Sequence, residues 1–311
     1  MAAFFLRPHA KQPGGDRVTQ FADISSVLFL GATVIFAAVV ILIAVAIFAP
    51  RPWRDRLARP SLILLAGIAF PVVCLTVLLI YVLALPSSTA SDAKPTIRVE
   101  ITGELWWWRV RYLDESGALL VETANEISIP AGQLVEFVLK SDNVIHSFWI
   151  PELGTKLDMV PGHVNRMRVR APAAGVLSGQ CAEYCGAQHT KMKFAVHVLT
   201  PASFNAWLSA QRRPARMAGP ELQQGAQRFQ HACSACHTVR GTPATGTSGP
   251  DLTHVASRST LAAGVLTNNV GALAGWIAAS QDIKPGNRMP SFDQWSGEEL
   301  RAVANYLDSL K

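Results

Sequence analysis

Charged side chains are scarce in this 311-residue chain: they make up 16% of it, whereas hydrophobic residues make up half. Two long stretches, Ile24 to Ala49 and Ser61 to Pro86, contain no charge at all. Each is long enough to cross a hydrocarbon core of about 30 Å as a helix. Neither has the polar stripe that a core helix of a soluble protein shows. The sequence therefore predicts a transmembrane hairpin with spans at about 24–49 and 61–86.

Acidic residues are nearly absent from the loop between these stretches, which reads R-P-W-R-D-R-L-A-R-P. Short loops rich in arginine usually remain in the cytoplasm. We therefore expect a multi-pass protein of a bacterial-type plasma membrane, with all residues after 86 on the outer side. No separate secretory peptide is visible in residues 1–23, and the length of the first span argues against a cleaved signal.

A basic patch for nucleic acid is also missing. The net charge is +4 over residues 1–90 (seven basic, three acidic), −1 over 91–200 (11 and 12) and +3 over 201–311 (ten and seven). The basic excess lies mostly at the membrane end, so nucleic acid is a poor explanation for it.

Cysteine is rare, and four of the five cysteines fall in two short motifs. In the first, Q-C-A-E-Y-C-G-A-Q-H-T-K-M, Cys181 and Cys185 are followed by His189 and Met192. Thiolate, imidazole and thioether donors together suit copper. With His146 upstream, this is the ligand order of a cupredoxin, and the second cysteine allows two thiolates to bridge two copper ions. The fifth cysteine, Cys74, lies in an apolar span and is expected to be a packing residue.

Two other interpretations of this motif remain open. A cysteine pair in an exported domain is often a disulfide, and two cysteines with two histidines are a common zinc set. Neither accounts for Met192 or for the motif around His146.

The second motif, C-S-A-C-H, predicts covalent haem c on Cys233 and Cys236, with His237 as an axial ligand. By itself it is also compatible with a redox dithiol or half a zinc site. Met289 is the only methionine after His237 and is the expected second axial ligand. His254 is the alternative, since haem iron accepts either residue.

Between residues 96 and 199, short alternating segments are separated by turns containing glycine and proline. Such a pattern predicts a sandwich or barrel. We expect strands in I-R-V-E-I-T-G, L-W-W-W-R-V-R-Y, E-I-S-I-P, L-V-E-F-V-L-K-S, R-M-R-V-R and F-A-V-H-V-L, with the copper ligands on loops at one end.

The segments H-S-F-W-I-P-E-L-G-T-K-L-D-M-V-P-G and G-Q-C-A-E-Y-C-G-A-Q-H-T-K-M resemble subunit II of the haem–copper cytochrome c oxidases. The resemblance implies the dinuclear CuA centre of that family. Cys181 and Cys185 would bridge the coppers, with one histidine on each ion, Met192 as a weak ligand to one and the Glu183 carbonyl to the other. It further implies that Trp106 lies where electrons enter the domain, and that Glu183 reaches a magnesium or manganese ion shared with subunit I. The glutamate that this family often has at the cytoplasmic start of the second span is missing here, where the nearest acid is Asp55.

After residue 219 the chain resembles the small class I cytochromes c. The G-P-D-L-T segment is expected to place Pro250 near His237. The last helix begins with an S-x-x-E capping box at Ser296 and is expected to pack on the first helix of this domain.

The resulting fold class is a multi-domain membrane protein with a two-helix hairpin, an all-β cupredoxin-like sandwich and an all-α cytochrome c domain. The expected boundaries are 1–90, 91–200, 201–218 (helix and linker) and 219–311.

The resemblance implies an electron-transfer subunit of an oxidase that reduces oxygen to water and pumps protons. Its partners would be subunit I, other oxidase subunits and a c-type or other donor. A copper chaperone, a quinol oxidase subunit II and a CuA-bearing nitric oxide reductase subunit are the alternatives. The first has little use for haem c, the second lacks the copper ligands, and the third stays open.

Overall fold

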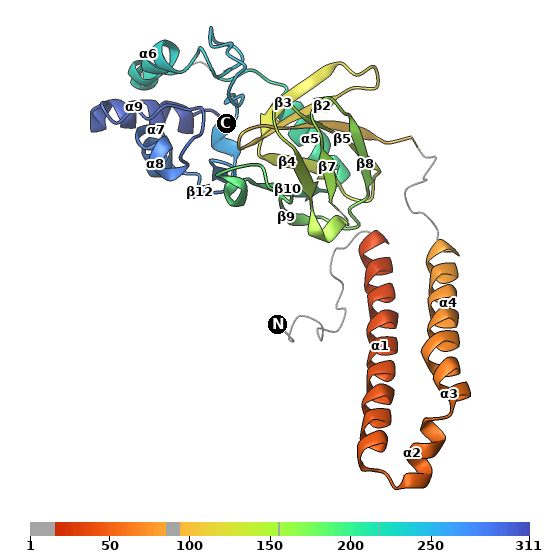
Figure 1. The fold of residues 1–311 in the computed structure, drawn as a ribbon. Helices are drawn as coiled ribbons and strands as arrows, with labels where there is room; N and C mark the ends of the chain where they lie inside the picture. Colours follow the sequence, from red (N-terminus) through yellow and green to blue (C-terminus); the bar gives the residue numbers. More distant parts are fainter. Residues whose placement is uncertain (1–15, 85–93, 155, 217) are drawn as a thin grey trace. The chain divides into compact units, whose positions relative to one another are not determined.

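The computed structural model describes residues 16–84, 94–154, 156–216 and 218–311. They form two compact units, the N-terminal helices and the chain from residue 94 onward (Figure 1). Most of the predicted linker at 86–95 lies outside the described residues, as do residues 1–15.

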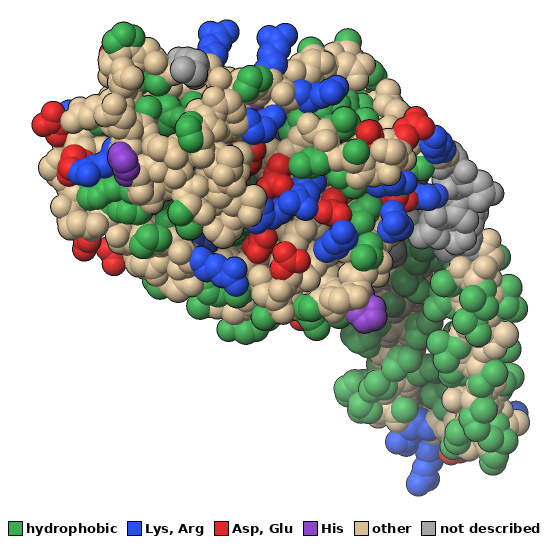
Figure 2. Space-filling model, turned by 90° about the horizontal axis from the view of Figure 1, so that it is seen from above, with side chains coloured by type: hydrophobic (Ala, Val, Ile, Leu, Met, Phe, Trp, Pro, Cys, Tyr) green, Lys and Arg blue, Asp and Glu red, His purple; other side chains and the backbone are tan. Residues whose placement is uncertain are grey.

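The N-terminal unit is entirely helical. Two of its helices are long and apolar enough to cross a membrane, at Ala22–Phe48 and Pro60–Ala84. Their large side chains lie open to the surroundings, with Phe36 70% and Leu83 74% exposed, and Figure 2 shows these helices as mostly hydrophobic. Such a surface is stable against lipid but not against water. The helices of this unit are α1 Asp16–Phe48, α2 Arg51–Leu57, α3 Pro60–Leu64 and α4 Phe70–Ala84.

Pro71 lies within the second apolar stretch, where a proline removes one backbone donor. The structure accommodates it with a π-helical turn, η2 Leu65–Ala69, inserted immediately before α4. A π-turn is one of the regular ways in which a helix absorbs such a break.

The second unit begins with a β-sandwich, which together with the following helix we call the β domain (residues 94–211). One sheet has the strand order β3-β2-β1-β5-β8 and the other β4-β10-β9-β6-β7. The strands are β1 Ile97–Gly103, β2 Trp108–Leu113, β3 Leu119–Ala124, β4 Glu126–Pro130, β5 Val135–Ser141, β6 His146–Trp149, β7 Leu157–Met159, β8 Asn165–Val169, β9 Gly175–Cys181 and β10 Lys193–Leu199. Helix α5 Pro201–Gln211 and the 3-10 turns η3 Pro151–Leu153 and η4 His189–Lys191 complete the domain.

Aromatic rings fill the space between the two sheets. Phe148 stacks on Phe194 at a centroid distance of 4.7 Å, and Trp108 meets Phe194 edge-on at 5.2 Å. Gly179 leaves room for this cluster, because a Cβ there would lie 2.1 Å from the Phe194 ring. These contacts join β2, β6, β9 and β10, so they hold together the strands that carry the candidate copper ligands.

The rest of the second unit, residues 218–311, has a core of its own, and we call it the helical domain. It contains α6 Gln223–Ala232, α7 Val270–Ala278, α8 Ser280–Ile283 and α9 Gly297–Asp308, with the 3-10 turns η5 Pro220–Leu222 and η6 Val255–Ser257. Strands β11 Thr260–Leu261 and β12 Leu266–Thr267 form a two-stranded sheet.

The last helix packs on the first helix of this domain, as expected. Gly225 of α6 makes the close approach possible, because a Cβ there would lie 2.1 Å from the carbonyl oxygen of Ala302 in α9. The capping box is present, with Ser296 and Glu299 each accepting a hydrogen bond from the backbone of the other.

Two expectations about the β domain were wrong. The aromatic strand begins at Trp108, and Trp106 and Trp107 lie in a turn in which Glu104 and Trp107 exchange backbone hydrogen bonds. The alternation expected along a strand therefore does not apply to the three tryptophans. In addition, His146 and Cys181 lie at strand ends, not on loops, because β6 and β9 pair with each other.

Candidate metal and haem sites

The predicted copper ligands lie together at one end of the β-sandwich. The ligand atoms of His146, Cys181 and Cys185 all lie within 4.8 Å of one another, and all three side chains are buried. His146 begins β6, Cys181 ends β9, and Cys185 lies on the loop that follows. Strand pairing therefore fixes two of the three ligands, which is the support that a preorganised metal site needs.

The two sulfur atoms are 3.7 Å apart. A disulfide bond requires about 2.05 Å, so the structure describes two free thiols. Each sulfur faces its own histidine: Cys181 Sγ lies 3.8 Å from His146 Nδ1, and Cys185 Sγ lies 3.7 Å from His189 Nδ1.

Two further donors complete the arrangement. The backbone oxygen of Glu183 lies 3.2 Å from Cys181 Sγ, and Met192 Sδ lies 3.9 Å from Cys185 Sγ. Separations of this size fit donor atoms that share a metal ion, since metal–sulfur and metal–nitrogen bonds are about 2.0–2.3 Å long.

The arrangement favours two ions over a single zinc ion. Four ligands around one tetrahedral ion lie about 4 Å or less from one another. His189 does not belong to the group whose atoms are all within 4.8 Å. The donors instead gather around a pair of thiols: His146 and the Glu183 carbonyl lie near Cys181, and His189 and Met192 lie near Cys185.

The environment of the site controls which donor atoms are free. His146 Nε2 lies 3.1 Å from Oδ1 of Asn143, which leaves Nδ1 as the ligand atom. The hydrogen-bond contact between the two thiols lowers the pKa of Cys181 and raises the pKa of Cys185. One thiolate is thus favoured before any metal binds.

The second site lies where α6 ends. His237 follows Cys233 and Cys236 in a turn closed by the bond from the His237 N–H to the Cys233 carbonyl, at 3.0 Å. Its Nδ1 donates to the Pro250 carbonyl at 2.8 Å, as expected of the G-P-D-L-T segment. This bond leaves Nε2 free, and burial lowers the pKa of His237, which favours the neutral ring that a metal ligand needs.

The Cys233 thiol does not resemble the reactive thiol of a redox dithiol. Burial raises the pKa of Cys233 to about 12, whereas the reactive cysteine of a redox pair has a lowered pKa. A cysteine that forms a thioether to haem does not need a lowered pKa once the haem is attached.

The two candidates for the second axial ligand, His254 and Met289, differ in the contacts that their side chains make. His254 is 8% exposed and its Nε2 bonds the Arg213 carbonyl at 3.0 Å. Met289 packs on the core of the helical domain, and its backbone is fixed through bonds from Ser280 and Gln281 to its carbonyl. The geometry therefore leaves Met289 as the better candidate.

Two known protein families match separate parts of the second unit. The periplasmic domain of cytochrome c oxidase subunit II matches residues 97–199, and the cytochrome c family matches residues 222–311. A cytochrome c oxidase subunit 2 from Alkalihalophilus pseudofirmus is 36% identical over 249 residues, which are 76% of this chain and 70% of the relative.

The chain belongs to the subunit II family of cytochrome c oxidases. Subunit 2 of Bacillus sp. strain PS3 is 30% identical over 80% of this chain and 72% of its own. The crystal structure of the periplasmic domain of subunit II from Bradyrhizobium japonicum covers 39% of this chain and 96% of its own, at 27% identity and a TM-score of 0.36. The part that matches a periplasmic domain is the β domain, and the apolar helices precede it in the chain.

Glu183 has a side-chain partner that the sequence did not predict. Its carboxylate lies 3.1 Å from the Lys156 ammonium. The side chain is therefore already paired with a cation, while its backbone oxygen faces the copper ligands.

Two buried residues that bond segments next to the sites were not identified from the sequence, Arg109 and Lys284. Arg109 looks like an exposed strand residue, and Lys284 simply precedes a Pro-Gly turn. Both are buried, at 8% and 2% exposure, and no sequence motif marked them.

Proposed function

We propose that this chain is the subunit of a terminal oxidase that receives electrons from a cytochrome c-type donor and passes them to a haem in subunit I. The complex would reduce oxygen to water and couple this to proton pumping. The observation that carries the proposal is a pair of free thiols 3.7 Å apart, each with a histidine nitrogen within 3.8 Å of its sulfur.

The residues that would hold copper fit the metal by their chemistry, since thiolate, imidazole and thioether are copper donors. Bound there, two copper ions would supply a one-electron carrier. The proposed ligands are His146, Cys181, Cys185, His189, Met192 and the backbone carbonyl of Glu183.

The protein's own contribution at this centre is to hold the donors and exclude water. Cys181, Cys185 and Met192 are at most 4% exposed. The donors are fixed by strand pairing and by the hydrogen bond from the Met192 backbone to the His189 carbonyl, at 3.3 Å. A rigid donor set of this kind resists rearrangement when the charge of the site changes.

For haem c, the proposed attachment residues are Cys233 and Cys236, and the proposed axial ligands are His237 and Met289. The fit rests on the free Nε2 of His237 and on the position of Met289 against the core of the helical domain. A His/Met pair raises the reduction potential of a haem, which suits transfer from a c-type donor.

The orientation follows from the charge of the loop between the spans. Its four arginines and single acid, in residues 51–60, favour a cytoplasmic loop. Both metal domains then lie on the outer side of a bacterial-type plasma membrane. A magnesium or manganese ion shared with subunit I stays a prediction, and at Glu183 it would have to displace Lys156.

The experiment that tests this function uses the full-length chain, purified in detergent. We expect two coppers and one haem per chain, and a mixed-valence copper EPR signal of seven lines. Cys181→Ser should abolish that signal and leave the haem spectrum intact. Zinc in place of copper, or a disulfide between Cys181 and Cys185, would overturn the proposal.

The choice between oxygen and nitric oxide as the final acceptor needs turnover of the assembled complex. The relatives named above are cytochrome c oxidase subunits, which favours oxygen. Turnover with nitric oxide and none with oxygen would instead identify the electron-transfer subunit of a nitric oxide reductase.

A further inference from the structure

Lys284 of the helical domain is bound by the β domain. Its ammonium donates to the backbone carbonyls of Trp106 at 2.7 Å and Lys191 at 2.8 Å, both in the β domain. A third bond, of 3.0 Å, goes to Ala262 in its own domain. Lys284 is only 2% exposed, so water does not solvate its ammonium. The three carbonyls accept the hydrogen bonds that water would accept at an exposed lysine.

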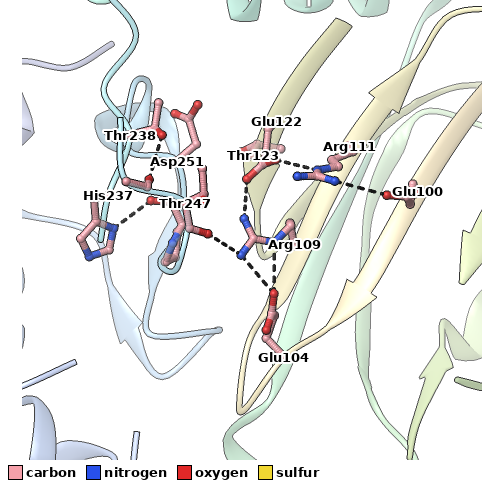
Figure 3. A network of polar contacts seen from close by, with 12 residues as sticks. Glu100, Glu104, Arg109, Arg111, Glu122, Thr123, His237, Thr238, Thr247 and Asp251 are labelled. Atoms are coloured by element: carbon pink, nitrogen blue, oxygen red, sulfur yellow. Dashed lines mark hydrogen bonds and ion pairs between the residues drawn. The ribbon is translucent and has the colours of Figure 1, made fainter. Parts of the chain in front are cut away.

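Arg109 of the β domain bonds the helical domain in turn. It lies at the end of the turn 104–109, which also contains Trp106. Its Nη2 donates to the Thr247 carbonyl of the helical domain at 2.9 Å. Figure 3 shows this guanidinium between Glu104 and Glu122, with Thr247 in the loop that approaches His237. Ion pairs of 3.0 Å to Glu104 and 2.7 Å to Glu122 hold the guanidinium in place.

The two contacts lie on segments next to the two candidate axial ligands. Thr247 is three residues before Pro250, whose carbonyl accepts the bond from His237. Lys284 is five residues before Met289. The turn 104–109 of the β domain therefore contacts the histidine side and the methionine side of the helical domain at once.

Trp106 lies inside this turn and is covered on both edges. A Cβ on Gly186, in the copper loop, would be 3.1 Å from Cζ2 of the indole. A Cβ on Gly286, in the helical domain, would be 3.6 Å from its Cη2. The indole is 9% exposed, and its nitrogen donates to the Cys185 carbonyl at 2.8 Å.

Other contacts between the domains repeat the pattern. Gln188 donates to the Pro285 carbonyl at 2.7 Å, and Lys191 donates to the Ile283 carbonyl at 2.8 Å. Glu126 of β4 accepts bonds from Ser259 and Thr260. Contacts through buried donors and fixed backbone acceptors define one geometry, whereas a loosely tethered domain would meet its partner through solvated side chains.

We infer that Lys284 and Arg109 are positioning residues that hold the helical domain in one fixed pose on the β domain, and that this pose closes Trp106 to an external protein donor. The inference rests on the proposed function, because it concerns the tryptophan next to the copper site. It implies that the donor docks on the helical domain. It also means that a fixed interface, not tethering by residues 212–218, sets the distance between the two sites.

The first test measures the accessibility of Trp106 by hydroxyl-radical footprinting of the metal-loaded full-length chain, read by mass spectrometry. In the unchanged protein Trp106 should react slowly. Lys284→Met removes the ammonium but keeps an apolar stem, so oxidation of Trp106 should rise by on the order of tenfold. Trp207, which packs on Tyr112 within the β domain, should not change and serves as the internal reference.

The matched control is Lys311→Met, the same change at an exposed lysine of the same domain, and it should leave Trp106 protected. If Lys284→Met does not fold, Lys191→Met tests the same interface, since the half-buried Lys191 bonds the Ile283 carbonyl across it. A smaller rise in Trp106 oxidation, about threefold, is expected there.

The second test is spectroscopic. A ferric haem held at a fixed short distance speeds the relaxation of the copper EPR signal. In Lys284→Met that signal should therefore saturate at lower microwave power. Loss of the copper or haem signal itself would count against the proposed function, not against the fixed pose. The inference would be overturned if the copper and haem signals are normal and Trp106 either reacts readily in the unchanged protein or is no more reactive in Lys284→Met.

Discussion

The indole nitrogen of Trp106 donates a hydrogen bond of 2.8 Å to the backbone carbonyl of Cys185. This bond links a turn that contacts the helical domain directly to the copper loop. It also explains why a tryptophan is suited to this position, since a buried ring carries its own donor.

Replacing Trp106 with phenylalanine should keep the ring and remove the bond. We expect normal copper and haem content, slower reduction of copper after rapid mixing with a donor, and a loss of about 1 kcal/mol of stability. For a unit of this size that loss lowers the unfolding midpoint by about 2–4 °C in calorimetry. Trp207→Phe is the control, because it removes a partly buried indole away from the copper loop. Equal slowing in both variants would contradict a specific role for Trp106.

Met289→Ala should leave haem attached through Cys233 and Cys236 but change its axial coordination. The midpoint potential should fall by on the order of 0.1 V, within the range of about 0.8 V that axial ligands set, while the copper EPR signal is unchanged. His254→Ala should leave the haem spectrum and potential as they are, because His254 bonds the Arg213 carbonyl. The opposite pattern in redox titrations of the two variants would make His254 the ligand.

Glu136 should give the β domain a stability that depends on pH. Burial of its carboxylate raises its pKa, but hydrogen bonds and charge from Arg168, Arg166 and Arg98 outweigh burial and hold the pKa below its usual value. Stability from this group is therefore complete above the unfolded pKa of about 4.3 and is lost as the pH falls through the lower folded value.

Glu136→Gln should cost about 2 kcal/mol at neutral pH and nothing at the lowest pH, as measured by urea unfolding at several pH values. Glu115→Gln, which removes a fully exposed ion pair with Lys94, should have no measurable effect. A constant difference between Glu136→Gln and the unchanged protein at all pH values would show that the charge is not involved.

Gly225→Ala should destabilise the helical domain by about 3 kcal/mol, because the added methyl group would collide with the Ala302 carbonyl where α6 meets α9. Gly275→Ala on α7 is the matched control, since nothing lies within 4 Å of its added Cβ, and it should change stability by about 1 kcal/mol at most. Thermal unfolding followed at the haem absorption measures both. Equal stability of the two variants would mean that the helices do not meet as described.

Much of the architecture was predictable because its signals are local. The uncharged spans, the alternating strands, the capping box at Ser296 and the two cysteine motifs each lie within a short stretch of sequence. The ligand set was also predictable, because chemistry restricts which side chains suit copper or haem. The limits of the strands were harder to predict from the sequence. Trp106 and Trp107 are residues of a type common in strands, yet the pairing of β1 with β2 ends at Trp108.

By itself the sequence determined the kinds of sites and the order of the domains, since these depend on residue type and spacing. Only the tertiary structure decided how the helical domain meets the copper loop. The bonds from Lys284 to Trp106 and from Arg109 to Thr247 join residues 178 and 138 positions apart. Their acceptors are backbone carbonyls, which every residue has, so no side-chain pattern could identify them before the chain was folded.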